Sequence, residues 1–342
     1  MYDPEMLPSS EMVPFLDLDV TVVIVTFQSA EELPDCLASL RAATGDLTSE
    51  VVLVDNASGD RSPEIAREAG VTQVIANREN VGFARAVNQA IRVARGRSIL
   101  LLNPDTVLAA NAVSVLVRLL DDHPKAGAVA PRTRNECGQL VRSCRAFPSL
   151  TGLVAQVTGL AWRFPNHRVF GAETLTYWDY ACERTVDYAS GACLLLRKTA
   201  LDEVGTFDEA YFMYVEEMDL SLRLWKAGWE VWFTPRAEVT HRGGRSASKV
   251  KQAHGFEPLL LEAYYSGQIR FWRRYRGQPS LLAWRAITAG SQLVRAGRWG
   301  LKGLLATGAA RDAALQRVRR SVVVARLALG REAGLLSVEK KQ

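Results

Sequence analysis

VTVVIVTF at residues 20–27 and VVLVDNASGD at residues 51–60 are the two runs that decide the fold. The first is rich in β-branched residues and the second opens with four apolar residues, so both predict buried strands. A helical pattern at residues 30–41 lies between them. A strand, a helix and a second strand predict a right-handed parallel unit, in which both strands end at the same edge of a sheet.

The same alternation continues outward from this unit as far as residue 130. We expect three further strands, at residues 71–76, 98–102 and 126–130. We expect three further helices, at residues 62–69, 83–95 and 110–121. The predicted fold class is therefore α/β, with a mostly parallel, doubly wound sheet, and ligands of such sheets bind at the carboxyl ends of the strands.

The rest of the chain has a weaker pattern, and residues 140–185 in particular show little periodicity. Further on, we expect a strand at 186–197 around Ser190-Gly191-Ala192, a helix at 215–227, a short strand at 230–233 closed by Pro235, and a flexible loop at 241–246. From about residue 253 onward the chain looks helical and basic.

Length and composition set the class of protein. With 342 residues, 48% apolar, the chain can form a sizeable core in about two domains, which excludes wholesale disorder. The five cysteines form no C-x-x-C, which disfavours a disulfide framework or a zinc ribbon and favours a reduced, cytosolic compartment. Residues 1–17 contain no Lys or Arg, so we expect no signal peptide, and no run is long and apolar enough to span a membrane.

The charge is unevenly distributed along the chain. Residues 241–342 contain 20 Lys and Arg against 5 Asp and Glu, whereas residues 1–240 contain 22 against 32. An acidic body with a basic tail indicates an anionic partner, for which membrane lipid and nucleic acid are the candidates.

Two acidic residues follow predicted strands and should open on one crevice. Asp55 ends VVLVD, and Asp105 lies in Asn103-Pro104-Asp105, directly after the strand at 98–102. A carboxylate at a strand's carboxyl end suits a hard cation, which prefers oxygen ligands. The alternative for each is a turn Asp that binds its own backbone.

A second acidic group stands at the start of the helix at 215–227. Glu216, Glu217 and Asp219 fall within four residues, where the helix dipole favours negative charge, so they could be capping residues or a general base with supporting carboxylates. His241, beside two glycines, could bind a transition metal or be an ordinary surface histidine.

Asn80-Val81-Gly82-Phe83 precedes the helix at 83–95, with Arg85 and Asn88 just inside it. Backbone N–H groups at a helix start can bind a diphosphate, although an ordinary cap has the same sequence. The chain has no G-x-G-x-x-G and no P-loop motif, which disfavours a dinucleotide enzyme or a P-loop nucleotidase.

Seven runs between residues 21 and 246, in this order, resemble the inverting, nucleotide-sugar-dependent glycosyltransferase family 2, which has a GT-A fold. They are VTVVIVTFQS, VVLVDNASGD, NRENVGFARAVNQAI, ILLLNPDT, SGACLLLRKTAL, FDEAYFMYVEEMDLSLRLWKAGW and HRGGRS. Within the family they look most like bacterial rhamnosyltransferases of cell-wall and O-antigen assembly. The resemblance implies a GT-A catalytic domain at 19–250, after an acidic extension at 1–18 and before a basic helical region at 251–342.

The resemblance also implies roles for individual residues. Asp105 stands where the family has the metal-binding acid of its D-x-D motif, here in the form N-P-D, and His241 would be a second ligand of Mg²⁺ or Mn²⁺. Glu217 falls where many members have an Asp general base, which leaves open whether Glu217, Glu216 or Asp219 takes the proton. The nucleotide-sugar site would comprise Thr26, Asp55, Asn56, Asn80, Gly82, Arg85, Asn88, Asn103, Asp105 and Gly191.

The implied reaction is a single displacement that inverts the anomeric centre, with a hydroxyl of a glycan or lipid-linked glycan as acceptor. From overall similarity we expect dTDP-rhamnose as the donor; UDP-galactofuranose or UDP-glucose would use much the same motifs. A catalytically silent, nucleotide-sugar-binding scaffold subunit is the alternative from another class. Residues 19–135 would bind the donor, and residues 136–250 would carry the acceptor side and the catalytic base.

The basic region interleaves aromatic residues with arginines, as in RFWRRYRG at 270–277. This composition favours peripheral contact with an anionic membrane, at the inner face of the plasma membrane, over nucleic-acid binding. The alternatives are a helical subdomain packed on the catalytic core and a homo-oligomer interface.

Overall fold

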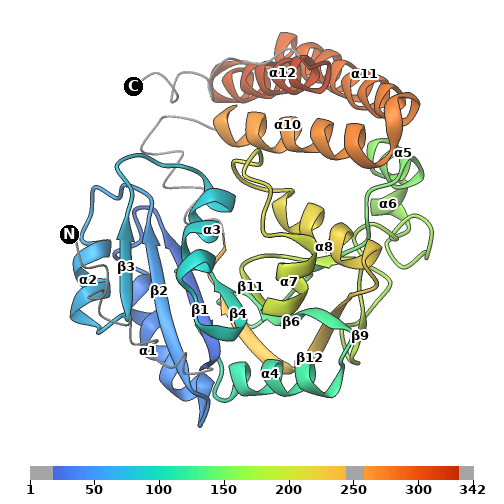
Figure 1. The fold of residues 1–342 in the computed structure, drawn as a ribbon. Coiled ribbons are helices and arrows are strands. Elements are labelled where there is room, and N and C mark those ends of the chain that lie inside the picture. Colours follow the sequence, from blue (N-terminus) through green and yellow to red (C-terminus); the bar gives the residue numbers. More distant parts are fainter. Residues whose placement is uncertain (1–17, 244–257, 331–342) are drawn as a thin grey trace, which may run out of the picture.

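The computed structural model describes residues 18–243 and 258–330 (Figure 1). The expected acidic extension lies outside the described residues except for Leu18, and so does the end of HRGGRS from residue 244.

One sheet runs through the catalytic part of the chain, in the strand order β3-β2-β1-β4-β11-β6-β12-β5. Its strands are β1 (Leu18–Thr26), β2 (Ser49–Asp55), β3 (Gln73–Ala76), β4 (Gly96–Leu102), β5 (Thr106–Leu108), β6 (Ala126–Arg134), β11 (Cys193–Arg197) and β12 (Glu230–His241). β3, β2, β1 and β4 are parallel neighbours, as are β6 and β12, whereas β11 and β5 run antiparallel to their neighbours. The prediction of a mostly parallel α/β sheet is confirmed.

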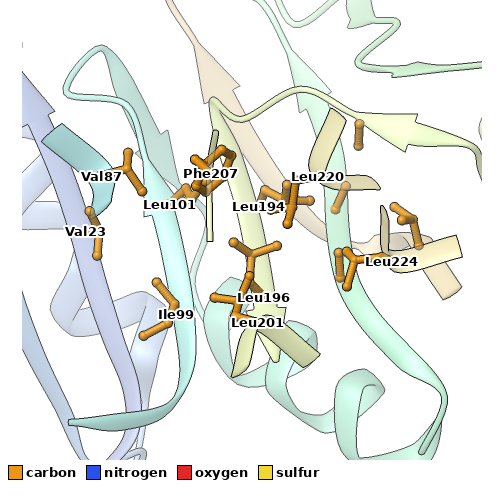
Figure 2. Close-up of a cluster of buried hydrophobic side chains, with 14 of the residues drawn as sticks. Val23, Val87, Ile99, Leu101, Leu194, Leu196, Leu201, Phe207, Leu220 and Leu224 are labelled. Carbon is orange, nitrogen blue, oxygen red and sulfur yellow. The ribbon is translucent and has the colours of Figure 1, made fainter. Parts of the chain in front are cut away.

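Helices cover both faces of this sheet, because successive residues of a buried strand point to opposite sides. Val22 and Ile24 of β1 pack with α1 (Leu33–Thr44), α2 (Ser62–Glu68) and α4 (Ala112–Asp122). Val23 packs on the other face with α3 (Phe83–Val93), α7 (Lys198–Val204) and α8 (Glu216–Lys226). Figure 2 shows that second core, where Val87 of α3 and Leu220 and Leu224 of α8 meet side chains of the sheet.

The structure differs from two of the strand predictions. The strand expected at 186–197 is two strands, β10 (Tyr188–Ala189) and β11, separated by a turn at Ser190-Gly191-Ala192. Pro235 does not end the strand at 230–233, because β12 passes it with a shift of register between Thr234 and Glu238. A proline is tolerated at such an irregularity, where no ladder hydrogen bond needs its missing N–H.

The weakly patterned segment at 140–185 forms short elements, two of which pair with strands of the sheet. The elements are β7 (Leu140–Val141), β8 (Cys144–Arg145), α5 (Leu150–Thr158), α6 (Leu160–Arg163) and β9 (Arg184–Thr185). β7 pairs with β6, and β9 pairs with β12. β8 pairs with β10 in a separate two-stranded sheet, which places Arg145 opposite Tyr188.

The described part of the basic region, residues 258–330, forms three helices, α10 (Pro258–Tyr275), α11 (Gly277–Leu304) and α12 (Gly308–Ala328), which lie together across one end of the molecule (Figure 1). Phe271 and Trp272 of α10 form a third core with Tyr211, Val215 and Met218 at the start of α8. Within the described ranges, no helix combines the length and the apolar character needed to cross a bilayer.

Candidate active site

A cavity of about 250 Å³ lies at the edge where β1, β2 and β4 end. Eight of the residues expected at the site line it: Asn56, Asn80, Asn103, Asp105, Gly191, Glu216, Glu217 and His241. Their elements are far apart in the sequence, so the cavity forms only when the sheet is complete. Asp105, the pair Glu216 and Glu217, and His241, each ambiguous alone, therefore face one space, whereas Asp55 and Asp219 do not.

Strand pairing brings Asp105 and His241 together. β5 begins directly after Asp105, and β12 pairs with it antiparallel so that His241 stands opposite Thr106. His241 is therefore the last residue of a strand and not part of the flexible loop that its glycine neighbours predicted. The alternation of buried Ala237 and Val239 with more exposed residues after Pro235 was the signal for this extension.

The Asp105–His241 pair fits a divalent cation. Asp105 is 3% exposed, its Oδ1 accepts no hydrogen bond, and His241 Nε2 lies 3.2 Å from it. A buried carboxylate oxygen without a donor is costly unless something pairs with it, and carboxylate and imidazole are ligands that Mg²⁺ or Mn²⁺ can take. Among the described residues no cluster of three or more His, Cys, Asp or Glu could hold a metal, and this pair supplies two side-chain ligands.

The carboxylate pair stands at the first turn of α8. Tyr214 and Val215, just before it, both have left-handed backbone, with φ of 66° and 71°. This conformation is strained for a β-branched residue, and such strain gathers at functional sites. Val215 is held there because it packs in the third core and against Gly267 of α10.

The carboxyl groups of Glu216 and Glu217 are neighbours, and both are buried away from water. Burial and the adjacent Glu217 carboxylate raise the pKa of Glu216 well above its usual range. Burial also raises the pKa of Glu217, while a hydrogen bond from Glu216 opposes that rise. In each carboxyl group, Oε2 has no hydrogen-bond partner. The pair therefore binds a proton more tightly than two solvated glutamates would.

Five more expected site residues, Thr26, Asp55, Gly82, Arg85 and Asn88, do not line the cavity. Thr26 and Asp55 end paired strands behind Asn56, and the Thr26 hydroxyl donates to Asp55 Oδ1 over 2.9 Å. Arg85 forms an ion pair with Glu209, at 3.2 Å.

Gly82 and Asn88 hold the surrounding loops. Gly82 N–H donates to Asn80 Oδ1, and Phe83 N–H donates to Phe212 O, so these two N–H groups at the start of α3 are not free for the expected anion. Gly82 has φ of 84°, and a Cβ there would meet Phe212 O at 2.5 Å. Asn88 is buried and bonds the Phe207 backbone through both its amide nitrogen and its oxygen.

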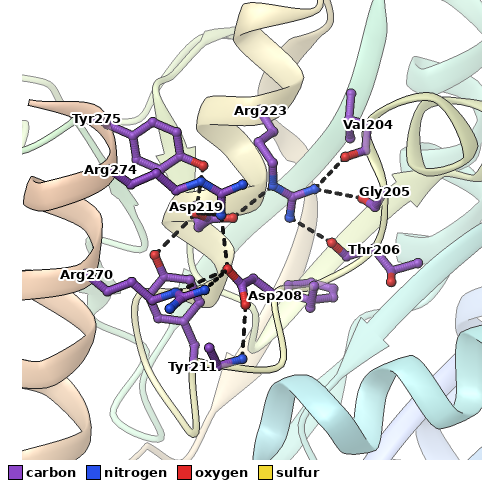
Figure 3. Close-up of polar contacts among 12 residues, drawn as sticks. Val204, Gly205, Thr206, Asp208, Tyr211, Asp219, Arg223, Arg270, Arg274 and Tyr275 are labelled. Atoms are coloured by element: carbon purple, nitrogen blue, oxygen red, sulfur yellow. Dashed lines mark hydrogen bonds and ion pairs between the residues drawn. The ribbon is translucent and has the colours of Figure 1, made fainter.

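Asp219 belongs to a different cluster, on the side of α8 that faces the basic tail (Figure 3). Its carboxylate accepts from Arg223 Nε at 2.8 Å, from Tyr275 OH at 2.8 Å and from Tyr211 OH at 3.2 Å. Nearby, Asp208 accepts from arginines of α10. The cavity does not include Asp219, whose contacts join α8 to α10.

Several lining residues were not anticipated from the sequence. They include the aromatic residues Phe27, Phe83 and Tyr214, and Ser190, Ala192 and Met213. The quoted motifs contain all six, but an aromatic or small residue in a motif does not by itself indicate a ligand contact. These six residues line the same cavity only because the strand ends and turns that carry them lie close together in the fold.

Comparisons with known proteins agree with this geometry. The model of the family "Glycosyl transferase family 2" matches residues 21–169, and that of "Glycosyl transferase family group 2" matches residues 150–311. The N-acetylglucosaminyl-diphospho-decaprenol L-rhamnosyltransferase of Mycobacterium tuberculosis is 33% identical over 300 residues, which are 82% of this chain and 96% of that protein. The poly-beta-1,6-N-acetyl-D-glucosamine synthase of Staphylococcus aureus is 25% identical over 72% of this chain and 57% of its own.

A solved structure supports the fold alone. GalNAc-T7, crystallised with UDP, GalNAc and Mn²⁺, superposes with a TM-score of 0.50 at 17% identity, over 66% of this chain and 44% of that one. The fold is thus the GT-A arrangement. With two family models and a relative matched over nearly its whole length, the chain belongs to glycosyl transferase family 2 and is a glycosyltransferase.

Proposed function

We propose that this enzyme transfers L-rhamnose from dTDP-rhamnose to a hydroxyl of a lipid-linked sugar diphosphate, with inversion at the anomeric carbon. One observation carries the proposal: a single cavity is lined both by a pair that fits a cation, Asp105 and His241, and by a carboxylate pair, Glu216 and Glu217. Sugar transfer needs both groups, one for the leaving diphosphate and one for the acceptor proton.

Asp105 and His241 would hold Mg²⁺ or Mn²⁺, which supplies neutralising charge for the departing nucleoside diphosphate. The strand pairing between β5 and β12 fixes both side chains before the donor arrives, and such preorganisation is what makes electrostatic stabilisation effective. Asn56, Asn80 and Asn103 surround the same cavity and offer amide groups to the nucleotide sugar.

Glu217 is the proposed general base. It takes the proton of the acceptor hydroxyl while that oxygen forms a bond to the anomeric carbon. The bond from the anomeric carbon to the diphosphate oxygen breaks, and the nucleoside diphosphate leaves with its electron pair. Because one carboxylate acts and no covalent intermediate forms, attack comes from the face opposite the leaving group.

The choice of donor and acceptor rests on the mycobacterial relative, whose name specifies L-rhamnose and a diphospho-decaprenol acceptor. Its match extends over nearly its full length, so both substrates' sites fall within the compared region. We assign donor binding to residues 19–135, and the acceptor side to residues 136–250 with the basic helices.

Peripheral contact with an anionic membrane belongs to the same proposal. The last turns of α11 expose Leu301, Leu304 and Leu305, and Arg298 and Lys302 stand among them. Apolar side chains beside cations suit the interface of an anionic bilayer, where a lipid-linked acceptor is found.

The test is transfer by the purified protein from a panel of nucleotide sugars to N-acetylglucosaminyl diphosphate bearing a farnesyl chain, with Mg²⁺, Mn²⁺ or EDTA. We expect rhamnose transfer that EDTA abolishes, and a product whose anomeric configuration is opposite to the donor's. Transfer of a different sugar would overturn the donor assignment, and a retained configuration would overturn the single displacement.

A further inference from the structure

A second, larger cavity, of about 1000 Å³, lies between the basic helices and the weakly patterned segment at 140–176. α10 and α11 supply one wall, and β7, β8, α5 and α6 supply the other. Neither the family motifs nor the cation site contributes to it.

Cations and aromatic rings line this cavity together. Arg142, Arg145 and Arg295 stand against a single carboxyl group, Glu173, whose pKa burial raises. The aromatic residues of the lining are Trp162, Tyr188, Tyr264, Tyr265, Trp272 and Trp284. Arginines bind phosphate oxygens, and sugar rings can stack on aromatic faces, so the walls suit an anionic glycoconjugate.

Two residues that line this cavity each carry a buried polar atom without a partner among the residues that the structure describes. Trp272 is 1% exposed and its Nε1–H donates to nothing, and Thr288 is 5% exposed with an unpartnered Oγ1. A buried donor without an acceptor costs about 1–3 kcal/mol. Both atoms are covered by the lining, so a ligand with hydroxyl or phosphate oxygens would satisfy them by displacing the atoms that cover them.

The second cavity adjoins the carboxylate pair. Tyr214 of the first cavity and Tyr264 of the second make an edge-to-face contact, with ring centroids 6.5 Å apart. Burial, and after it the Glu217 carboxylate, raises the pKa of Tyr188, which lines the second cavity. The linings of the two cavities are therefore in contact on the side of the proposed base.

We propose that the second cavity binds the acceptor as a sugar diphosphate carrying an apolar chain, with its sugar toward Glu217 and its diphosphate on Arg145 and Arg142. This inference rests on the proposed function for the class of acceptor. Arg145 is placed for the diphosphate because it pairs across β8 and β10 with Tyr188, beside the base. The apolar chain leaves past α11, where Leu293 and Val294, exposed at 58% and 65%, stand between the lining residues Gln292 and Arg295.

The deciding variants remove the unpartnered groups. Thr288→Val keeps the shape and loses the hydroxyl, whereas Trp272→Phe keeps an aromatic ring and loses the Nε1–H together with part of the indole. A merely structural role predicts unchanged kinetics in both variants and, for Thr288→Val, equal or higher stability, because that variant removes only an unsatisfied buried group. We expect the KM for farnesyl-diphospho-N-acetylglucosamine to rise about 5- to 30-fold in each, while the KM for the nucleotide sugar stays the same.

Trp178→Phe is the matched control. Trp178 also has an unpartnered buried Nε1, but it lies in the sheet core and outside the cavity, so acceptor kinetics should not change. Arg145→Gln should raise the acceptor KM at least 10-fold. An unchanged acceptor KM in Trp272→Phe, Thr288→Val and Arg145→Gln would overturn the inference.

Binding of the farnesyl probe without donor separates this inference from the proposed function. Calorimetric binding to the wild type that is lost in Arg145→Gln supports the acceptor site even if dTDP-rhamnose is never transferred. Rhamnose transfer by the wild type with unaltered probe binding in all three variants would leave the function standing and refute the site.

Discussion

Two carboxyl groups, Glu216 and Glu217, face each other in a cavity where neither is well solvated. A folded-state pKa above the unfolded value means that the folded protein binds the proton more tightly. The contribution of Glu216 to the free energy of unfolding is therefore largest below about pH 4, the ordinary range of glutamate. This contribution is lost as the pH rises through the raised pKa. The site therefore costs the protein stability at neutral pH, as active sites often do.

Replacing Glu216 with a neutral side chain of the same shape should reveal this loss of stability. We expect Glu216→Gln to raise the thermal midpoint by about 2–4 °C at pH 8, and by less at pH 5, because the amide removes the cost of burying charge. The measurement is calorimetry of wild type and variant across that pH range. A variant less stable than the wild type at pH 8 would mean that the charge is compensated.

Glu217→Gln should separate catalysis from folding. We expect turnover to fall by about 10²- to 10⁴-fold with little change in donor affinity, since the lost group acts on the acceptor proton. In the wild type, turnover should fall with acid at a midpoint above that of an ordinary glutamate, because burial raises the pKa of Glu217. Full activity in Glu217→Gln, with loss in Glu216→Gln, would assign the base to Glu216.

Asp105→Asn tests the cation site without changing its shape. We expect calorimetry to find that divalent metal no longer strengthens nucleoside diphosphate binding, because one anionic ligand is gone. Asp35→Asn is the control, since Asp35 is an exposed carboxylate that pairs with Arg242 outside the cavity. Metal-dependent binding that survives in Asp105→Asn would contradict the assignment.

At the scale of elements, α8 serves two purposes. Its first turn presents the carboxylate pair to the cavity, and Asp219, one turn further along the helix, is held by Arg223 and by Tyr275 of α10. The sequence showed three acids at a helix start but not that they face two directions. That division depends on where α10 packs, which the spacing of residues within α8 cannot reveal.

Asp219→Asn should weaken the contact between α8 and α10. Removing one partner of a buried ion pair leaves Arg223 without its charge partner, at a cost of about 3 kcal/mol. We expect a thermal midpoint lower by several degrees and partial loss of turnover, measured by calorimetry and the transfer assay. Arg97→Gln, which breaks only exposed ion pairs, is the control. Unchanged stability in Asp219→Asn would show that α10 is anchored elsewhere.

The elements that could be predicted from the sequence are those with a clear hydrophobic pattern. β1, β2 and β4 were placed within two residues because buried parallel strands are continuous apolar runs. β5 was missed since three residues carry no period, and β12 was ended at Pro235 because its bulge hides the continuing alternation. These two strands position the cation pair, so the site's residues were expected from motifs while their geometry was not.

On the scale of the whole molecule, the acidic and the basic parts of the chain form two regions that pack against each other. The acidic body contains the cavity lined by Asp105 and His241, and the basic helices form a wall of the second cavity and expose an apolar end at Leu304 and Leu305. The sequence alone left membrane contact and packing on the core as alternatives. The structure gives α10 a packed face, while α11 keeps an exposed one.

The exposed end of α11 should direct membrane binding. We expect co-sedimentation with vesicles containing anionic lipid, little with neutral vesicles, and at least a 5-fold loss in the double variant Leu304→Gln, Leu305→Gln. Val93→Gln is the control, an exposed apolar residue at the end of α3. Equal sedimentation with anionic and neutral vesicles would overturn the electrostatic part of the proposal.

The joint between α8 and α10 also bears on inhibitor design. Arg274 and Tyr275 of α10 both contact Asp219 and so hold the helix that carries the proposed base, on a side outside the first cavity. A cavity of about 510 Å³ opens there, lined by Asp208, Arg270, Arg273 and Arg274. A compound wedged into it would misalign Glu217 without resembling either substrate, and increasing the concentration of donor or acceptor would not relieve the inhibition.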